Sequence, residues 1–217
     1  MSTHLGVPEY LVEKLADPFD VFSLMHALRG LGKLVEEYNE ELFSQYEDVA
    51  PKYRDVGLEQ GLEAMSIVIG AGFVAAQSIL TSTFSCVKGL TELEVIRSAG
   101  GAGLPKVKKE LFQVAAYDRS GVPDISGVNA LANYFKHASE WPYDWNALIK
   151  PLEVETVRIV SKLGLRPGHP DNMFIGAYTL SFGGRDGLFK LAERVQEWRE
   201  GVEREVRRRL IEAGLLS

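Results

Sequence analysis

Apolar residues recur every three or four positions over several long segments of the chain, which is the period of an amphipathic α-helix. The first such segment follows Asp17 and Pro18, a pair typical of a helix N-cap and first helical position. Its apolar positions are Val21, Leu24, Leu28, Leu31, Val35, Tyr38 and Leu42. Gly30 and Gly32 interrupt it. Because each costs a helix about 1 kcal/mol relative to alanine, they indicate close packing of a neighbour or a kink.

The most apolar segment, residues 61–90, predicts a second long helix after a connection around Pro51 and Gly57. It carries no charge over residues 64–87, so its length alone would allow it to cross a bilayer. Serine and threonine are frequent in it, however, and neither an aromatic belt nor a basic cluster flanks it. The other amphipathic helices also need a central partner, so we interpret this segment as a core helix and expect no membrane segment.

Helical periodicity, together with glycine and proline residues that end helices, predicts further helices over residues 105–117, 125–140, 151–163, 172–180 and 186–213. The glycine-rich stretch Ser98–Gly103 is expected to be a loop, and no segment alternates strictly enough to be a strand. We therefore predict an all-α fold, an up-and-down bundle of about six to seven helices. A single domain is expected over residues 1–217, with residues 1–16 loosely ordered.

Charged residues on the last predicted helix are arranged in pairs four positions apart, with the acid first: Glu200 with Arg204, Glu203 with Arg207, and Glu205 with Arg209. Each such pair stabilises a helix by about 0.2 to 0.5 kcal/mol. The arginine cluster at residues 207–209 is therefore interpreted as a solvated, ion-paired face rather than a nucleic-acid patch.

Composition narrows the possible functions. The chain has 30 acidic and 24 basic residues, a net charge of −6, which argues against a broad electrostatic footprint for nucleic acid but leaves room for a local basic groove. Cys86 is the single cysteine, so neither a disulfide nor a cysteine-rich metal site can form within the chain. Residues 1–5 lack the features of a secretory signal, and we expect a cytoplasmic protein. No histidine pair has metal-ligand spacing, and Gly100, Gly101 and Gly103 match neither nucleotide-binding fingerprint, so we expect no metal and no cofactor.

The predicted helix over residues 125–140 carries the candidate chemistry. Asn129, Asn133 and His137 are spaced four residues apart and share one face, with Lys136 and Glu140 beside them. A carboxamide one turn before a histidine can orient the imidazole or hold a phosphate oxygen, and histidine is suited to moving protons near neutral pH. The alternative is that His137 only forms a hydrogen bond or meets solvent at a helix end. The segment Trp141–Trp145 would then be an aromatic cap over the core.

The string of residues 132–137, late in a helical bundle after a long apolar helix, resembles the motif of the HEPN superfamily. That motif is an arginine, a polar residue that is often asparagine, a short spacer and a histidine. Asn133 matches the polar position and His137 the histidine, while Ala132 stands where the arginine is expected. The resemblance implies a homodimer in which both motifs line one cleft, and metal-independent cleavage of RNA in which histidine assists attack of the 2′-hydroxyl.

On this resemblance, His137 would be the catalytic histidine and Asn133 would orient it. Lys136 could take the place of the absent arginine, although it offers a point charge rather than a planar fork. Arg54, Arg97 and Arg119 are expected on or near loops and are further candidates for the arginine role.

Two classes of function remain open at this point. The first is a metal-independent ribonuclease or RNA-binding member of a bacterial toxin or antiviral-type system. It predicts RNA cleavage that survives chelator and is lost in His137→Ala. The second is a non-catalytic homodimeric interaction module, which binds a second copy or another protein and whose activities do not depend on His137.

Overall fold

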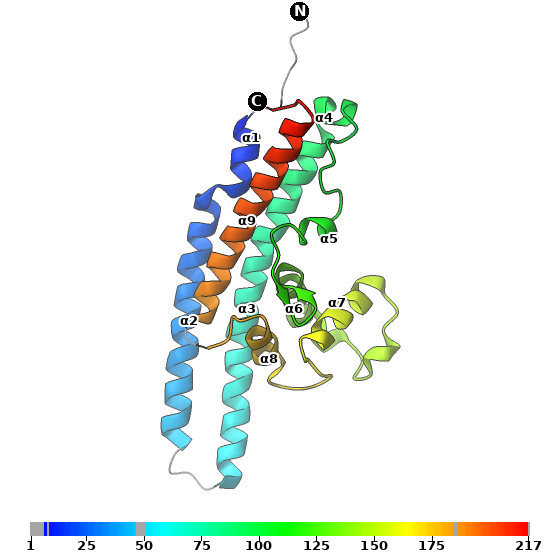
Figure 1. The fold of residues 1–217 in the computed structure, drawn as a ribbon. Coiled ribbons are helices and arrows are strands. Elements are labelled where there is room, and N and C mark those ends of the chain that lie inside the picture. The colour runs from blue at the N-terminus through cyan, green and yellow to red at the C-terminus, as the bar shows by residue number, and fades with distance from the viewer. Residues whose placement is uncertain (1–6, 8, 47–50, 185, 217) are drawn as a thin grey trace, which may run out of the picture.

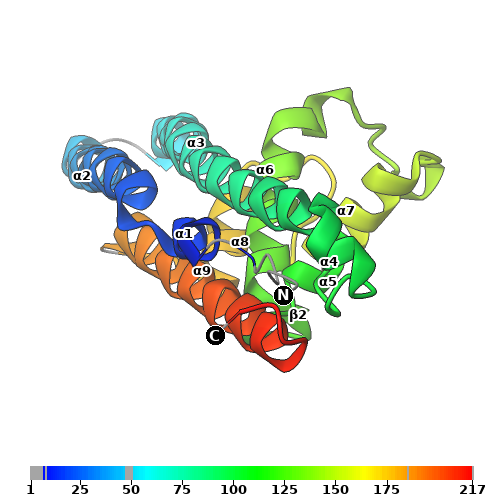
Figure 2. The same ribbon diagram turned by 90° about the horizontal axis from the view of Figure 1, so that it is seen from above.

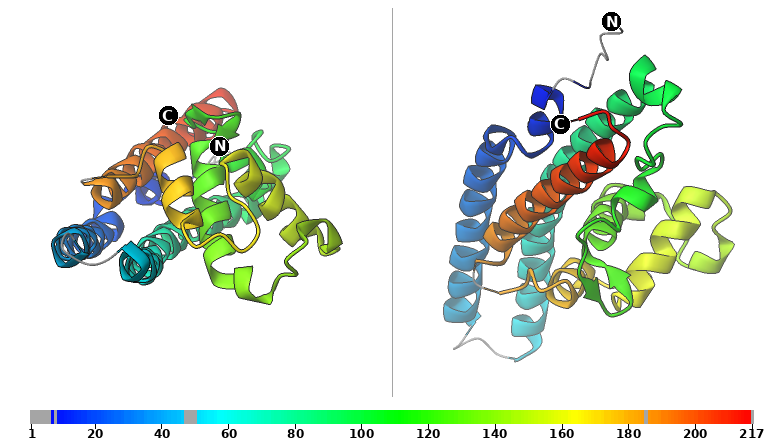
Figure 3. Two further views of the ribbon diagram at one scale, coloured as in Figure 1. Left: turned by 90° about the horizontal axis from the view of Figure 1, so that it is seen from below. Right: turned by 45° about the horizontal axis from the view of Figure 1, so that its top comes forward.

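The fold is built on a long helical hairpin. The computed structural model describes residue 7 and residues 9–46, 51–184 and 186–216, apart from the side chains of residues 42, 43, 45, 46 and 51–59. Helices α2 (Pro18–Tyr46) and α3 (Pro51–Glu92) are antiparallel, and α9 (Gly187–Glu212) packs along both of them (Figure 1). The helices α6 (Asp124–His137), α7 (Pro151–Lys162) and α8 (Asn172–Thr179) lie on the side of α3 that is away from α2 (Figures 2 and 3). The all-α prediction is confirmed.

Helix α3 is the central element, because it contacts α2, α6, α8 and α9. The apolar stripe of α9 faces this core with almost no exposed surface: Leu188, Leu191, Val195, Trp198, Val202, Val206 and Leu210. Among the described residues, one helical stretch, Gln60–Glu92, is long and apolar enough to cross a membrane by length and composition, and half of its most apolar window is buried within the protein.

The N-terminal segment differs from expectation. Residues 9–16 form α1 (Glu9–Glu13) and a 3₁₀ turn (Lys14–Ala16), in which Val12 and Leu15 have no exposed surface. The buried guanidinium of Arg199 on α9 donates hydrogen bonds to the backbone carbonyls of Leu15 (2.9 Å) and Asp17 (3.0 Å). These carbonyls lie where the 3₁₀ turn ends and α2 begins. Arg199, far away in the sequence, therefore helps to hold residues 14–17 in place. Residues 1–6 and 8 of the segment that was expected to be loosely ordered lie outside the described residues.

The start of α3 was also predicted wrongly. The helix begins at Pro51, not at residue 61, and runs through Gly57. Proline fits the first turn of a helix, and one glycine costs about 1 kcal/mol, which a long helix with a packed face tolerates. Residues 47–50 of the predicted connection lie outside the described residues.

The helix predicted over residues 105–117 is mostly absent, since only α5 (Lys108–Leu111) forms there. Side chains of α9 bind two carbonyls of this segment: Trp198 Nε1 donates to the carbonyl of Leu111 (3.4 Å), and Arg194 Nη2 donates to that of Ala115 (2.5 Å). The Leu111 carbonyl also accepts from the backbone amide of Val114 (3.1 Å) in a turn. Ala115 itself has a φ of 49°, which ends helical geometry. Tertiary hydrogen bonds thus override the local periodicity.

The chain then forms a short β-hairpin, where no strand was expected. Its two antiparallel strands, β1 (Asp118–Arg119) and β2 (Val122–Pro123), have two residues each. Ser120 and Gly121 at its tip both have positive φ, 57° and 72°, the conformation that a tight two-residue hairpin turn needs. The remaining helices agree with prediction to within a few residues. Helix α4 (Glu94–Ser98) ends at the expected glycine loop.

Candidate functional site on helix α6

Helix α6 is enclosed by the rest of the fold on most of its surface. Ile125, Val128, Leu131 and Ala132 have no exposed surface, and Tyr134 is nearly buried. Gly70 of α3 lies so close to the ring of Phe135 that a Cβ there would overlap it. The helix is therefore clamped between α3 and the α7–α8 side of the molecule, and position 132, where the HEPN-like motif would have arginine, faces the core.

Two of the three predicted site residues, Asn133 and Lys136, bind Gln77 of α3, a residue that was not predicted from the sequence. Gln77 Nε2 donates hydrogen bonds to Oδ1 of Asn129 (2.9 Å), Oδ1 of Asn133 (2.8 Å) and the carbonyl of Asn129 (3.3 Å). Lys136 Nζ in turn donates to Gln77 Oε1 (2.7 Å). Because a carboxamide both donates and accepts, Gln77 connects two asparagine oxygens to an ammonium group across the α3–α6 interface.

We call Gln77, Asn129, Asn133 and Lys136 the Gln77 network. Its central residue, Gln77, is buried, with only 9% of its surface exposed. A buried amide that lost its partners would cost stability, so the asparagines and the lysine satisfy the polar group within the apolar α3. The sequence signal was available: Gln77 is an amide in a run of residues without charge.

His137 lies apart from the Gln77 network. It is the last residue of α6, and its Nδ1 is 3.4 Å from Oε1 of Glu140, with about half or more of each side chain exposed. Among the contacts between described side chains, none joins His137 to Asn133 or Lys136. The spacing of four residues correctly placed Asn129 and Asn133 on one face, but that face turns toward α3, and His137 meets solvent where the helix ends.

The segment after α6 packs as an aromatic cap, as the alternative interpretation predicted. The rings of Tyr134, Trp141 and Trp145 contact one another edge to face, with centroids 5.8 to 6.3 Å apart. Asn172 Nδ2 donates to the Tyr134 hydroxyl (2.6 Å), and burial raises the pKa of that hydroxyl. The cap and this hydrogen bond join α6 to Asn172, the first residue of α8.

The other arginine candidates are not brought to His137 by the described contacts. Arg119 lies on β1, before the first residue of α6, and a helix of 14 residues spans about 20 Å between its ends. Arg97 is exposed on α4. The side chain of Arg54 lies outside the described residues.

The basic cluster at the end of α9 is paired, as predicted. Its ion pairs join Arg207 to Glu9 and Glu203, Arg208 to Glu205 and Glu212, and Arg209 to Glu205, at 2.5 to 2.8 Å. The hydrogen bonds from Arg208 and Arg209 lower the pKa of Glu205 to about 2, against an opposing effect of burial. These arginines are therefore already neutralised by carboxylates of the same chain.

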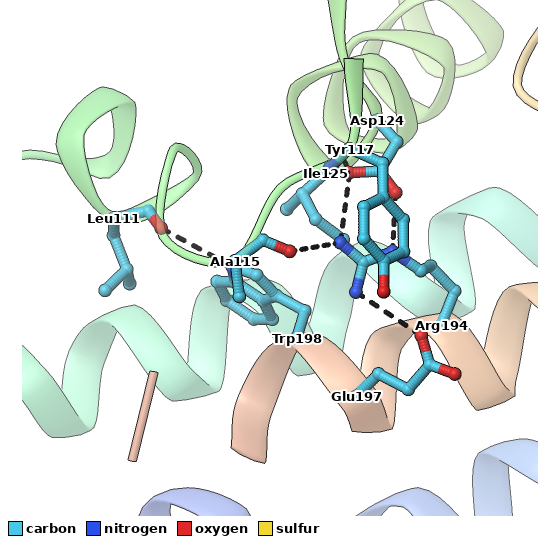
Figure 4. A network of polar contacts seen from close by, with 8 residues as sticks. All are labelled: Leu111, Ala115, Tyr117, Asp124, Ile125, Arg194, Glu197 and Trp198. Carbon is cyan, nitrogen blue, oxygen red and sulfur yellow. Dashed lines mark hydrogen bonds and ion pairs between the residues drawn. The ribbon is translucent and has the colours of Figure 1, made fainter. Parts of the chain in front are cut away.

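A second buried polar group was missed by the sequence analysis. Arg194 on α9 donates to Asp124 at the start of α6, with Nε 2.5 Å from Oδ2 (Figure 4). Asp124 Oδ1 also accepts from the backbone amides of Tyr117 (3.1 Å) and Ile125 (2.8 Å), and the guanidinium lies 4.1 Å from the centroid of the Tyr117 ring. This pair positions the start of α6. Sequence patterns do not reveal it, because the two residues are 70 positions apart.

In the described part of the chain, no group of three or more histidine, cysteine, aspartate and glutamate residues is arranged to hold a metal ion. The site on α6 therefore consists of the Gln77 network and the separate pair of His137 and Glu140. In comparisons with protein-family models, curated proteins and solved structures the chain has no match, so the resemblance noted in its sequence neither gains nor loses support from them.

Proposed function

We propose that this protein is a non-catalytic, homodimeric interaction module. The observation that carries the proposal is the state of the motif on α6: Ala132 is wholly buried, and Asn133 and Lys136 are bound to Gln77. A ribonuclease of the HEPN type needs a cation beside the scissile phosphate, because stabilising the developing charge is commonly the largest catalytic contribution. Here position 132, where that cation would stand, faces the core. Lys136, the nearest substitute in the sequence, is bound to Gln77 and contributes to the packing of α6 on α3.

Exposed residues of α2 support self-association. Phe22, His26, Gly30, Leu34 and Tyr38 follow one another every four residues along the helix and form a ridge on its surface. Phe22 is 58%, Leu34 44% and Tyr38 46% exposed. Large exposed apolar side chains on a surface helix are typical of an interface.

The glycine in the middle of this ridge is unexplained within one copy. A Cβ on Gly30 would meet nothing within 4 Å, so its own chain does not require a glycine there. A close helix crossing favours one, because the distance between helix axes depends on side-chain size at the contact. Phe22 and Tyr38 are each eight residues from Gly30, so the ridge is self-complementary under a twofold axis through Gly30. The neighbour expected from this glycine would be the α2 helix of a second copy.

Sedimentation velocity tests the dimer. The wild type is expected to sediment as a dimer, and Phe22→Asp as a monomer, because the twofold axis places the introduced charge in the interface twice. Leu152→Asp is the matched control, since Leu152 is 69% exposed on α7, away from α2. A monomeric wild type, or a Phe22→Asp variant that remains dimeric, would refute the proposal.

Incubation of the purified protein with a mixed RNA pool and chelator tests the absence of catalysis. We expect no cleavage by the wild type or by His137→Ala. The second candidate function, a metal-independent ribonuclease, is favoured by one observation: the Glu140 carboxylate lies 3.4 Å from Nδ1 of the half-exposed His137, an arrangement in which Nε2 could act as a base. Products with 2′,3′-cyclic ends that His137→Ala abolishes would establish that candidate and overturn the non-catalytic proposal.

A further inference from the structure

A small pocket of about 60 Å³ lies where α5, the β-hairpin, α6 and α7 meet (Figure 1). Lys109 of α5, Ser126 of α6, and Arg158 and Lys162 of α7 line it, together with residues 121–123 of the hairpin. All its lining residues belong to a part of the chain in which every side chain is described. The pocket shares no residue with the Gln77 network, with the pair of His137 and Glu140 or with α2.

The pocket has the size of a single small group. A water needs about 10 to 15 Å³ of such a space, so about 60 Å³ admits the few oxygen atoms of a tetrahedral oxyanion. Pockets that enclose a whole small molecule have roughly 300 to 1,000 Å³. Any larger part of a ligand would therefore remain outside, in solvent.

Positive charge is in excess at this pocket. The guanidinium of Arg158 donates to both carboxylate oxygens of Glu155, with Nε at 2.8 Å and Nη2 at 2.7 Å, so these two charges neutralise each other. The hydrogen bonds from Arg158 lower the pKa of Glu155, and Lys109 and Lys162 lower it further from a longer distance. No described carboxylate forms an ion pair with Lys109 or Lys162, so two positive charges at the pocket have no anionic partner.

The other carboxylates of these elements do not compensate the excess. Each of them is bound elsewhere: Glu110 to the backbone amide of Lys106, Asp118 to that of Gly121, Asp124 to Arg194, and Glu153 to Lys150. None of these carboxylates lines the pocket. An anionic ligand would therefore find the two lysines available.

Neutral hydrogen-bond donors complete the lining. The hydroxyl of Ser126 and the carboxamide of Gln113 line the pocket, and neither side chain has a hydrogen-bond partner among the described residues. Lys162 Nζ donates to the carbonyl of Gly121 at 3.5 Å, which is long for a hydrogen bond, and an ammonium group has three hydrogens to donate. Lysines, hydroxyls and amides are the groups that proteins commonly use to bind phosphate oxygens.

The arrangement fits one phosphate group better than a nucleic-acid strand. A strand is bound by a row of cations that follows successive phosphates. The lysines beside Lys109 do not extend such a row, because Lys108 Nζ donates to Thr81 Oγ1 (3.3 Å) and the side chain of Lys106 lies beside Gly101. Two unpaired lysines instead match the charge of one phosphate dianion.

We propose that this pocket binds one dianionic phosphate group, either free phosphate or the head group of a small phosphomonoester, between Lys109 of α5 and Lys162 of α7. The hydroxyl of Ser126 donates to the same group. The inference is independent of the proposed dimer, because the lining belongs to one copy and includes no residue of α2.

Isothermal titration at pH 8 and low ionic strength tests the ligand class with three probes: methyl phosphate, inorganic phosphate and dimethyl phosphate. The first two are mostly dianions at this pH, whereas the diester carries one negative charge. Methyl phosphate is expected to bind once per chain and at least tenfold more tightly than dimethyl phosphate. No binding of either dianion, or equal binding of the monoester and the diester, would overturn the proposal.

The two dianions distinguish the source of the phosphate group. Tighter binding of inorganic phosphate supports the proposal with free phosphate as the ligand, and tighter binding of methyl phosphate supports it with a phosphomonoester as the ligand. A single-stranded RNA without terminal phosphates is the third comparison. If it bound more tightly than both dianions and lost its affinity in variants at the pocket, the pocket would be part of a nucleic-acid surface and the proposal would be wrong.

Three variants that remove the same charge locate the site. Lys109→Gln and Lys162→Gln are each expected to weaken the binding of methyl phosphate at least fivefold, because each removes one of the two unpaired cations. Lys106→Gln is the matched control, since Lys106 precedes α5 but does not line the pocket, and its effect is expected to be less than twofold. Equal losses in Lys106→Gln and Lys109→Gln would show a response to net charge alone and refute the site.

Ser126→Ala tests the pocket without changing any charge. It is expected to weaken the binding of methyl phosphate about threefold, because the phosphate loses one neutral hydrogen bond. An unchanged affinity would show that the hydroxyl does not contact the ligand, contrary to the proposal. The side chains of Lys106, Lys109 and Lys162 are exposed, and circular dichroism of each variant verifies that the fold is retained.

Discussion

The buried pair of Arg194 and Asp124 offers a sharp test of what holds α6 in place. Only 7% of the Arg194 side chain and 2% of the Asp124 side chain are exposed. Arg194→Met removes the guanidinium and fills much of its volume with an apolar chain. It leaves the Asp124 carboxylate buried with two backbone amide donors but no positive charge, and it leaves the carbonyl of Ala115 without its side-chain donor.

The expected cost is about 3 to 5 kcal/mol, the usual loss when one partner of a buried ion pair is removed, because the remaining charge is uncompensated. Arg204→Met is the matched control. Arg204 is on the same helix, but its guanidinium is 67% exposed and lies 3.9 Å from Glu200, so its loss is expected to cost less than about 1 kcal/mol. The geometry therefore predicts a several-fold difference in cost between two arginines of one helix.

Urea denaturation at pH 7, followed by tryptophan fluorescence and circular dichroism, measures the free energy of unfolding of each variant. The double variant Arg194→Met/Asp124→Asn is expected to recover part of the loss, since an uncharged amide is cheaper to bury than a carboxylate. A cost for Arg194→Met no greater than that for Arg204→Met, or a double variant less stable than Arg194→Met alone, would refute this account of the pair.

Other substitutions test packing, the Gln77 network and the charges of α9. Gly70→Ala is expected to destabilise the fold by about 1 to 3 kcal/mol, because the new methyl group overlaps the Phe135 ring, whereas Gly89→Ala on the same helix is expected to stabilise it by up to about 1 kcal/mol; thermal melts that show equal effects would contradict this. Gln77→Leu is expected to cost about 1 to 3 kcal/mol in urea denaturation, because the oxygens of Asn129 and Asn133 lose their donor, while exposed Ser78→Ala changes stability little. Glu205→Gln is expected to cost up to about 1 kcal/mol at pH 7. Because the pKa of Glu205 is lowered from 4.5 to about 2 in the folded protein, its stabilisation is complete above pH 4.5 and disappears as the pH falls through about 2. The difference from wild type should shrink over that range, and a difference that is the same at pH 7 and pH 2.5 would contradict the assignment.

The parts of the fold that could be predicted are those in which local periodicity and tertiary packing agree. Helix α9 is the clearest case: its apolar positions are all buried, and the acid-before-base pairs are formed. Both features depend only on the geometry of one helix, which the sequence encodes directly. The start of α2 at Pro18 follows in the same way from a local N-terminal signal.

The parts that could not be predicted depend on contacts between distant residues. Residues 105–117 have helical periodicity, but Trp198 and Arg194 take the carbonyls of Leu111 and Ala115 from positions 87 and 79 residues away. Arg199 binds the carbonyls of Leu15 and Lys14, which are 184 and 185 residues away in the sequence. No local pattern contains this information, because a side chain that binds a distant carbonyl looks in the sequence like any other arginine on a helix.

The candidate site on α6 could also be predicted only in part, because local periodicity does not show which neighbouring element a helix face meets. An amphipathic helix indicates which residues share a face, but α6 has apolar residues nearly all round it, so its periodicity does not say which face meets solvent. Asn129 and Asn133 were correctly placed together, yet their side turns toward Gln77. The feature that would have suggested this is the amide in the uncharged run of α3, since a buried polar group needs partners on a neighbouring element.

The burial of position 132 gives a physical reason for the alanine that stands there in place of the arginine of the motif. An arginine there would bring a charged group into a core where Ala132 has no exposed surface, next to Leu131 and Val128, which are equally buried. Burying an unpaired charge costs several kcal/mol, far more than a helix of this length gains from any single favourable contact. Alanine at this position is therefore what the packing of α6 demands. Any cation that acts with His137 would have to come from outside the motif, and in the described residues the nearest one in sequence, Lys136, is bound to Gln77.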